Sequence, residues 1–281
     1  MAKDIAIVVS TYNRPRALDL VLMGLSNQTC LPKEIIIADD GSTKETAELI
    51  NRWQDTGLPV KHVWHEDRGY RKTIIMNQAF SMVTARHTIF MDGDCIPLEN
   101  FVAHHVKYFE ERCVLAGPRI LASKAFTERL EQGRERIHSE SFVYWLQKKL
   151  HGEINRLGPL ITLPDGGWRR AKPKKWELVR GCNFSVGTRY VWDVDGFEES
   201  LYGWGPDDSD IAVRLINKGL SVKTLRFAAP VLHLWHREED RGNLQKNRDY
   251  LLSAISDKRT RALVGLSSHH YLKPFINSEE G

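Results

Sequence analysis

Two aspartates separated by a single glycine are the most informative feature of this 281-residue chain. Asp92 and Asp94 directly follow the apolar run 87–91, so both carboxylates emerge where a buried strand should end. In an open α/β sheet, ligands collect at the carboxyl ends of strands, and paired carboxylates can hold a divalent metal against a diphosphate. Asp and Gly are also ordinary turn formers, so the triplet alone more often marks a turn or a solvated edge.

The elements around this triplet bring further charged groups to the same place. Apolar runs predict strands at 5–10, 34–38, 60–64 and 87–91, and helical periodicity alternates with them, as expected of βαβ units with a mostly parallel, Rossmann-like sheet flanked by helices. Asp39 and Asp40 follow the second strand, and the charged loop 65–71 follows the third. Parallel strands point the same way, so these groups should meet Asp92 and Asp94 in one crevice.

The phosphate-binding motifs of other α/β proteins are missing from this sequence. Neither a Walker lysine loop nor a Gly-x-Gly-x-x-Gly motif follows the first strand, which disfavours P-loop and dinucleotide binding. A metal together with Arg or Lys is the obvious substitute for holding phosphates.

A second acidic cluster stands in the C-terminal half of the chain. Asp207, Asp208 and Asp210 lie at the start of a predicted helix and follow Trp204, which two glycines bracket. Helix capping suits these residue types, but capping needs one side chain and does not explain Trp204. Because clustered carboxylates gather at active sites, this group is a candidate source of a general base. Trp204 is either a core residue or an aromatic surface for a ligand, and its glycine-bracketed loop favours the ligand.

Composition restricts the class of protein. The formal net charge is +4, and the most concentrated basic run is 168–176. A solvated loop explains this run, as does contact with anionic lipid or an acidic acceptor; no nucleic-acid-binding signature accompanies it, so we expect no nucleic acid partner. The four cysteines form no Cys-x-x-Cys pair, which predicts free thiols in a reducing compartment.

No segment resembles a signal peptide or a membrane span. The N-terminal apolar run is too short for a signal-peptide core, and no run approaches the roughly 20 residues that cross a bilayer. We therefore expect a cytoplasmic protein, with peripheral contact at the anionic inner face of the cytoplasmic membrane as a further hypothesis.

The motifs together carry a family resemblance. Residues 9–14, 39–42 and 92–94 resemble the nucleotide-sugar half of family-2, GT-A-type glycosyltransferases. Residues 202–211 and 233–237 resemble the acceptor and metal motifs of the β-1,4-galactosyltransferase C-terminal region, which bacterial chondroitin-polymerase-type transferases also contain. The resemblance implies the GT-A fold, a UDP-sugar donor, and Mn²⁺ or Mg²⁺ as the metal.

The resemblance also implies roles for individual residues. Those expected to bind the nucleotide sugar are Thr11, Tyr12, Arg14, Asp40 at the uracil edge, Asp67 and Arg71 near the base and diphosphate, Asp92 at the ribose or sugar, and Asp94. The metal ligands would be Asp94 and His236, while His233 is either a second nitrogen ligand or a packing histidine. Trp204 and Asp207 would bind the acceptor, and Asp208 would be the catalytic base.

These roles imply a domain organisation. A GT-A catalytic domain would span 1–245, with a nucleotide-sugar half at 1–120, a helical and basic insertion or flap at 122–176, and an acceptor and metal half at 177–245; a helical tail would follow at 246–281.

The implied activity is inverting, metal-dependent transfer of a hexose or N-acetylhexosamine from a UDP-sugar. The acceptor would be a hydroxyl of a saccharide or lipid-linked glycan in bacterial polysaccharide or lipopolysaccharide synthesis. Two other classes remain open: a nucleotidyltransferase acting on a sugar phosphate, and a non-catalytic glycan-binding module.

Overall fold

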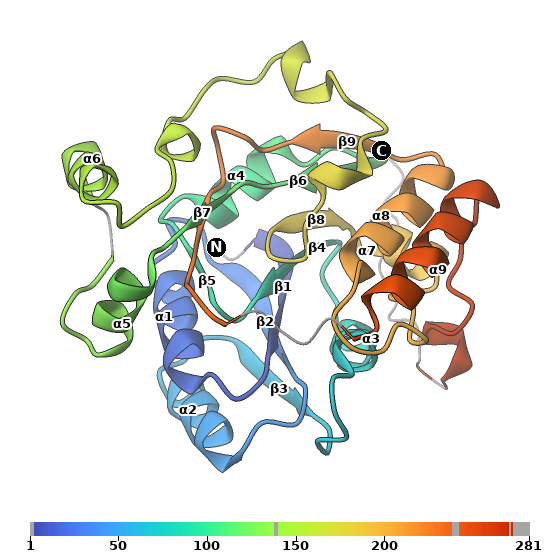
Figure 1. Ribbon diagram of the computed structural model, residues 1–281, viewed down its shortest axis with the longest axis horizontal. Coiled ribbons are helices and arrows are strands. Elements are labelled where there is room, and N and C mark those ends of the chain that lie inside the picture. Colours follow the sequence, from blue (N-terminus) through green and yellow to red (C-terminus); the bar gives the residue numbers. More distant parts are fainter. Residues whose placement is uncertain (1–2, 138–139, 238–241, 270, 272–281) are drawn as a thin grey trace.

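A seven-stranded sheet forms the centre of the protein in the computed structural model, which describes residues 3–137, 140–237, 242–269 and 271 (Figure 1). Its strands, in spatial order, are β3 (Val60–Trp64), β2 (Pro32–Asp39), β1 (Lys3–Thr11), β4 (His87–Asp92), β8 (Phe184–Gly187), β6 (Cys113–Ala116) and β9 (Ser221–Thr224). The pairs are parallel except where β8 meets β4 and β6. The predicted α/β fold with a mostly parallel sheet is confirmed.

Helices cover both faces of this sheet. Consecutive residues of β1, such as Ile7 and Val8, are fully buried on opposite sides of the sheet, which explains its continuous apolar run. One face packs against α1 (Pro15–Ser26), α2 (Lys44–Asp55), α4 (Phe101–Tyr108) and α5 (Lys124–Glu131); the other packs against α3 (Lys72–Ser81), α7 (Thr188–Asp193) and α8 (Asp207–Asn217).

A second, three-stranded sheet was not predicted from the sequence. It consists of β5 (Cys95–Pro97), β10 (Val231–His233) and β7 (Arg119–Leu121), with β10 in the middle. Strands of three residues leave no readable periodicity. This sheet places His233 opposite Cys95 and Leu121, so it joins the C-terminal histidine motif to the loop that carries Asp92 and Asp94.

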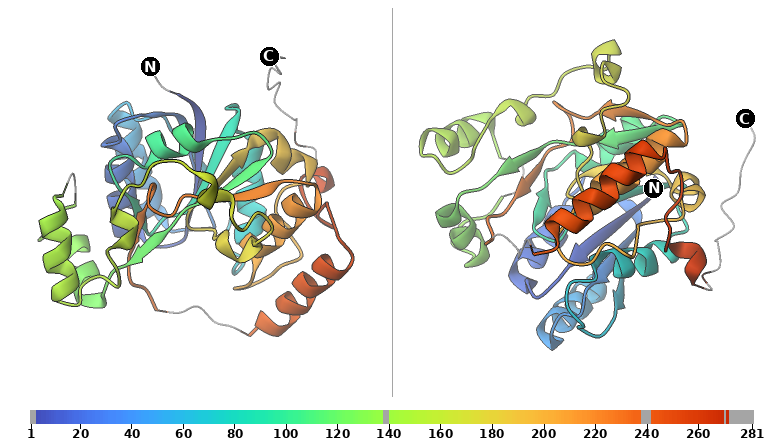
Figure 2. Two further views of the ribbon diagram at one scale, coloured as in Figure 1. Left: turned by 90° about the horizontal axis from the view of Figure 1, so that it is seen from above. Right: turned by 45° about the vertical axis from the view of Figure 1, so that its right-hand side comes forward.

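Residues 122–176 contain α5, α6 (Phe142–Leu150) and two short 3₁₀ turns, η1 (Gly158–Leu160) and η2 (Gly167–Arg170); a third, η3 (Trp176–Leu178), begins at their end. Figure 2 shows α5 and α6 at the periphery, away from α8 and α9. Arg169, part of the basic run, is fully buried and donates hydrogen bonds to the backbone carbonyls of Leu163, Thr224 and Arg226. At least this basic side chain is therefore structural.

The C-terminal segment folds back onto the domain. Helix α9 (Leu244–Ser256) packs against α8 (Figure 2). Asn247 on α9 donates a hydrogen bond to the carbonyl of Tyr202. A short turn, η4 (Leu266–Ser268), places Leu266 in the core beside α7. Part of the predicted tail, residues 272–281, lies outside the described residues, as do 238–241. Within the described residues, no helix has the length and apolar character needed to span a bilayer. All four cysteines are free thiols, as predicted.

Helix α8 is anchored by a buried ion pair. Arg214 donates to Asp210 Oδ2 from Nε at 2.9 Å and from Nη2 at 2.7 Å, and Nη1 donates to the carbonyls of Val194 and Gly196. Both side chains are fully buried. Asp210 therefore belongs to the support of the helix and not to the chemistry of the acidic cluster.

Removing this guanidinium should destabilise the protein, because a buried carboxylate and two carbonyls lose their hydrogen-bond donor. Replacing Arg214 with Met is expected to lower the free energy of unfolding by about 3 to 5 kcal/mol in urea denaturation. The second change Asp210→Leu should recover part of the loss, since an apolar pair leaves no buried charge unpaired. A loss below about 1 kcal/mol in the single variant would contradict this account.

Candidate active site

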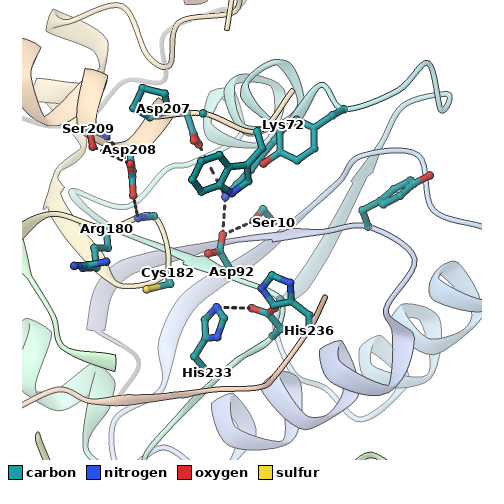
Figure 3. Close-up of a pocket in the computed structure, with 18 of the residues that line it drawn as sticks. Ser10, Lys72, Asp92, Arg180, Cys182, Asp207, Asp208, Ser209, His233 and His236 are labelled. Carbon is teal, nitrogen blue, oxygen red and sulfur yellow. Dashed lines mark hydrogen bonds and ion pairs between the residues drawn. The ribbon is translucent and has the colours of Figure 1, made fainter. Parts of the chain in front are cut away.

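A cleft of about 1070 Å³ opens at the carboxyl ends of β1 and β4 (Figure 3). It brings together most of the side chains that the sequence singled out. Those lining it are Thr11, Tyr12, Arg14, Asp40, Asp92, Asp94, Trp204, Asp207, Asp208, His233 and His236. Residues from both halves of the chain thus form one site.

Asp67 and Arg71 do not line this cleft, but each contacts a residue that does. Asp67 accepts a hydrogen bond from the Tyr12 hydroxyl at 2.9 Å, which raises the pKa of that tyrosine. The backbone N–H of Arg71 donates to Asp40 at 2.9 Å, while its side chain turns to the carbonyl of Glu66. Both remain candidates for the nucleotide site, with indirect roles in the present geometry.

The end of β2 contains two aspartates in different environments. Asp39 is fully buried, accepts from the Ser42 N–H at 2.8 Å and lies 2.9 Å from His62 Nε2, so it holds the loop. Asp40 reaches the cleft; its carboxylate lies 2.6 Å from His65 Nε2 and accepts the Arg71 N–H. Burial raises the pKa of Asp40.

Asp92 is paired with a lysine that the sequence analysis missed. Its Oδ1 accepts from Lys72 Nζ at 2.7 Å and from the Ser10 hydroxyl at 3.0 Å (Figure 3). Lys72 Nζ also lies 4.0 Å from Asp207 Oδ2, so one cation joins the two acidic clusters. Although burial opposes ionisation, Lys72 holds the pKa of Asp92 below its ordinary value. Lys72 directly follows the charged loop 65–71 at the start of α3, which was the available signal.

Replacing Lys72 with Met should destabilise the protein by about 1 to 3 kcal/mol at pH 8, because two carboxylates lose their cation. A carboxyl whose folded pKa is depressed adds stability above its unfolded pKa, and this stability is lost as pH falls through the folded value. The loss should therefore be smaller at pH 3 than at pH 8 in urea denaturation, because pH 3 lies below the ordinary carboxyl pKa of 3.8.

The matched control is Lys44→Met, because Lys44 forms an exposed pair with Glu48. Its effect should stay within about 0.5 kcal/mol. Equal losses in the two variants would show that Lys72 has no special role in stability.

The candidate metal site is built around Asp94. Ligand atoms of Asp94, Cys95 and His233 lie within 4.8 Å of one another, and His236 Nε2 lies 3.6 Å from Asp94 Oδ2. Arg14 donates to the same Asp94 oxygen at 2.9 Å. Burial lowers the pKa of His233, which favours the neutral imidazole that a metal requires, and raises that of the Cys95 thiol well above its ordinary value.

These donors fit a divalent metal of intermediate hardness. One carboxylate with one or two imidazoles suits Mn²⁺ better than Mg²⁺, whereas a buried thiol held in its protonated form is a poor ligand. Figure 3 shows His233 and His236 on the side of Asp92 opposite Lys72. His233 Nε2 therefore lies about as close to the Asp94 carboxylate as His236 Nε2, although the motif had favoured His236 as the ligand.

Asp207 and Asp208 occupy the first turn of α8. Asp208 Oδ2 accepts from the Gly181 N–H at 2.8 Å, and Oδ1 accepts from the Ser209 N–H at 2.6 Å. The bond to Ser209 is the capping role weighed from the sequence; the bond to Gly181 crosses the cleft wall and aims the carboxylate. Among the described residues Asp207 makes no bond across the cleft, and burial raises its pKa to about 6, with Lys72 opposing the shift and Asp208 adding to it.

This shift predicts the acid side of the pH profile. A carboxyl with a raised pKa ionises only as pH rises through about 6, so kcat/KM should fall below that pH if charged Asp207 binds the acceptor. In Asp207→Asn, stopped-assay rates across pH 5 to 8 should lose this limb; an unchanged limb would assign the ionisation to another group.

Comparisons with known proteins agree with this architecture. The family described as "Glycosyl transferase family 2" matches residues 6–167, and the one described as "N-terminal domain of galactosyltransferase" matches residues 171–237. The chain therefore belongs to family 2 of the glycosyltransferases.

Two curated relatives have 27% identity to this chain. Validoxylamine A glucosyltransferase of Streptomyces hygroscopicus subsp. limoneus aligns over 79% of this chain and 50% of its own length. Chondroitin synthase of Pasteurella multocida aligns over 76% of this chain and 23% of its own length. The chain thus spans half or less of these relatives.

Solved structures share the fold at low identity. TarS 1-349 of S. aureus in complex with UDP-GlcNAc has a TM-score of 0.61 at 14% identity, over 95% of this chain and 69% of that one. The mannosyltransferase PcManGT of Pyrobaculum calidifontis, in complex with GDP-Man and Mn2+, has a TM-score of 0.53 at 18% identity, over 83% and 57%. These likenesses confirm the predicted GT-A fold.

Proposed function

We propose that this protein is an inverting, metal-dependent glycosyltransferase that moves a hexose or N-acetylhexosamine from a UDP-sugar to a hydroxyl of a saccharide acceptor. One observation carries the proposal: Asp94 with its two histidines and Asp208 line one cleft, on either side of the Lys72–Asp92 pair. A glycan-binding module has no need of this arrangement, and a nucleotidyltransferase gives no reason for Trp204 beside Asp208.

The nucleotide end of the cleft lies at β1 and β2. Thr11, Tyr12 and Asp40 offer hydroxyls, an aromatic ring and a carboxylate, groups that suit a uracil and its ribose. The UDP complexes of related GT-A structures support this donor, and PcManGT supports Mn²⁺.

Asp94, His233 and His236 would hold the metal, which when bound supplies positive charge at the donor diphosphate. Arg14 donates to the Asp94 carboxylate and lines the cleft, so its guanidinium could also bind the donor phosphates. Lys72 keeps Asp92 ionised, and Asp92 would accept hydrogen bonds from the donor sugar or ribose.

Asp208 acts on the acceptor. Its Oδ2 is oriented by the Gly181 N–H, and a remaining lone pair can take the proton of the attacking hydroxyl. The hydroxyl oxygen bonds to the anomeric carbon on the face opposite the departing UDP, so the configuration inverts. Trp204 and Asp207 would orient the acceptor ring, the first by stacking and the second by hydrogen bonding.

Product analysis separates this function from its rivals. Incubation with Mn²⁺ and a panel of UDP-glucose, UDP-galactose and their N-acetyl forms should release UDP from at least one donor. Release of pyrophosphate from a sugar phosphate and nucleoside triphosphate would support a nucleotidyltransferase, and no release from any donor would support a binding module.

The proposal includes a location and an acceptor class. Free thiols suit a reducing cytoplasm, and a lipid-linked glycan of bacterial polysaccharide or lipopolysaccharide synthesis would bring the enzyme to the inner face of the membrane.

Helix α6 supports membrane contact, because Phe142, Val143, Leu146 and Leu150 are exposed on it. Phe142→Glu/Leu150→Glu should lose sedimentation with anionic vesicles; equal sedimentation would remove the membrane from the proposal.

A further inference from the structure

Four arginines gather beside the cleft. Arg119 and Arg180 line the cleft itself. Arg156 donates from Nε to the backbone carbonyl of Arg119 at 3.1 Å, and a second bond from Nη2 fixes the same pair. Partial burial lowers the pKa of Arg156, and the nearby charges of Arg180, Arg119 and Arg226 lower it further, so Arg226 lies close enough to be counted with the group.

In the described part of the chain, no carboxylate neutralises these guanidinium groups. Among the described residues, none of the four forms an ion pair with a carboxylate, whereas other arginines of the chain, such as Arg14 and Arg129, are paired. Like charges that crowd together without counterions repel, and an oxyanion placed among them relieves that repulsion. Guanidinium forks match the oxygens of phosphates and carboxylates and bind them in pairs.

The order of the strands assigns this group to the acceptor side. Asp40 follows β2, and Asp94 follows β4, so the donor extends from β2 toward β4. Arg119 is the first residue of β7 and stands three residues after β6, and Arg180 stands four residues before β8; β6 and β8 lie on the other side of β4. Gly181, next to Arg180, holds the proposed base Asp208. Figure 3 shows Arg180 on the Asp208 side of Asp92, opposite His236.

We infer that Arg119, Arg156, Arg180 and Arg226 form a subsite for an oxyanion, a phosphate or a carboxylate, that the acceptor saccharide carries near the hydroxyl to be glycosylated. The inference rests on the proposed function, since it assumes that the neighbouring carboxylate serves an acceptor. It adds that the acceptor is anionic, so that acceptor affinity falls as salt screens the cluster.

Calorimetry with inorganic phosphate tests the subsite directly. The protein is first saturated with UDP and Mn²⁺, so that the donor diphosphate site is filled, and phosphate is then titrated. Arg180→Gln/Arg226→Gln should weaken phosphate binding at least about tenfold, the loss expected for removal of charge-assisted hydrogen bonds. The matched control Arg52→Gln removes one exposed positive charge on α2 and should bind phosphate like the native protein. Equal phosphate binding by all three proteins would overturn the inference.

Three further arms identify the source of the anion. Parallel titration with acetate distinguishes a carboxylate preference from a phosphate preference, and tighter binding of either supports the subsite. Phosphate should inhibit transfer in competition with the saccharide acceptor; competition with the UDP-sugar instead would overturn the acceptor assignment. Parallel loss of binding to phosphatidylglycerol vesicles in the double variant would make a lipid headgroup the occupant and would also overturn it.

Failure of the proposed function and failure of the anion subsite give different results. Arg52→Gln should leave Mn²⁺-dependent hydrolysis of the UDP-sugar unchanged, because Arg52 lies on α2 and does not line the cleft. Absence of that hydrolysis in the native protein would contradict the proposed function, while phosphate binding would still report on the arginines.

Discussion

Replacing Asp94 with Ala should abolish Mn²⁺-dependent binding of UDP and lower the rate of UDP release by about 10³-fold. The carboxylate is the centre of the only group of three mutually close ligand residues found among the described residues, with His233 and Cys95. Without it, the positive charge that offsets the developing charge on the diphosphate is lost, and such stabilisation is worth several kcal/mol. Calorimetric titration of UDP with and without Mn²⁺ measures the effect on binding.

Glu131→Gln is the matched control. Glu131 accepts from the same Arg14 that contacts Asp94, so this change removes a neighbouring carboxylate without touching a proposed ligand. It should alter UDP affinity no more than a few-fold. If Asp94→Ala keeps the Mn²⁺ dependence of the native protein, the metal site has been placed on the wrong residue.

Replacing Asp208 with Asn should lower kcat by about 10² to 10⁴-fold, the contribution expected of a general base, while UDP and Mn²⁺ bind as before. The amide oxygen of Asn can still accept the Gly181 N–H, so the loop before β8 should keep its position. Single-turnover transfer with saturating UDP-sugar isolates the chemical step from binding.

Asp207 is the rival for this role, because its raised pKa would also suit a base near neutral pH. Asp207→Asn is expected to raise the KM for the acceptor more than it lowers kcat, in keeping with an acceptor-binding group. A larger loss of kcat in Asp207→Asn than in Asp208→Asn would exchange the two assignments.

Local sequence signals predicted much of this structure. The strand expected at 60–64 is β3, and the runs at 5–10, 34–38 and 87–91 are the cores of β1, β2 and β4. The apolar residues of β1, β2 and β4 are buried on both faces of the sheet, and a continuous apolar run predicts such burial from sequence. The convergence of Asp40, Asp92 and Asp94 followed, because parallel strands fix the edge at which loops emerge.

Features that depend on distant pairings did not follow. The three-stranded sheet joins residues 95–97, 119–121 and 231–233, and no local pattern reports such a pairing. The sequence around Arg119 therefore did not indicate a site residue, although Arg119 lines the cleft. Asp210 resembled part of a catalytic cluster in the sequence, but it pairs with Arg214 one helical turn away.

The most direct test of the central claim is proton NMR of the transfer reaction. Native protein, Mn²⁺, an α-linked UDP-sugar that it hydrolyses and a saccharide acceptor are followed through the anomeric region of the spectrum. We predict UDP and a product whose new linkage is β, formed with Mn²⁺ and lost on chelation or in Asp94→Ala. An α-linked product, or transfer that persists without metal in Asp94→Ala, would contradict the inverting, metal-dependent transferase proposed for this cleft.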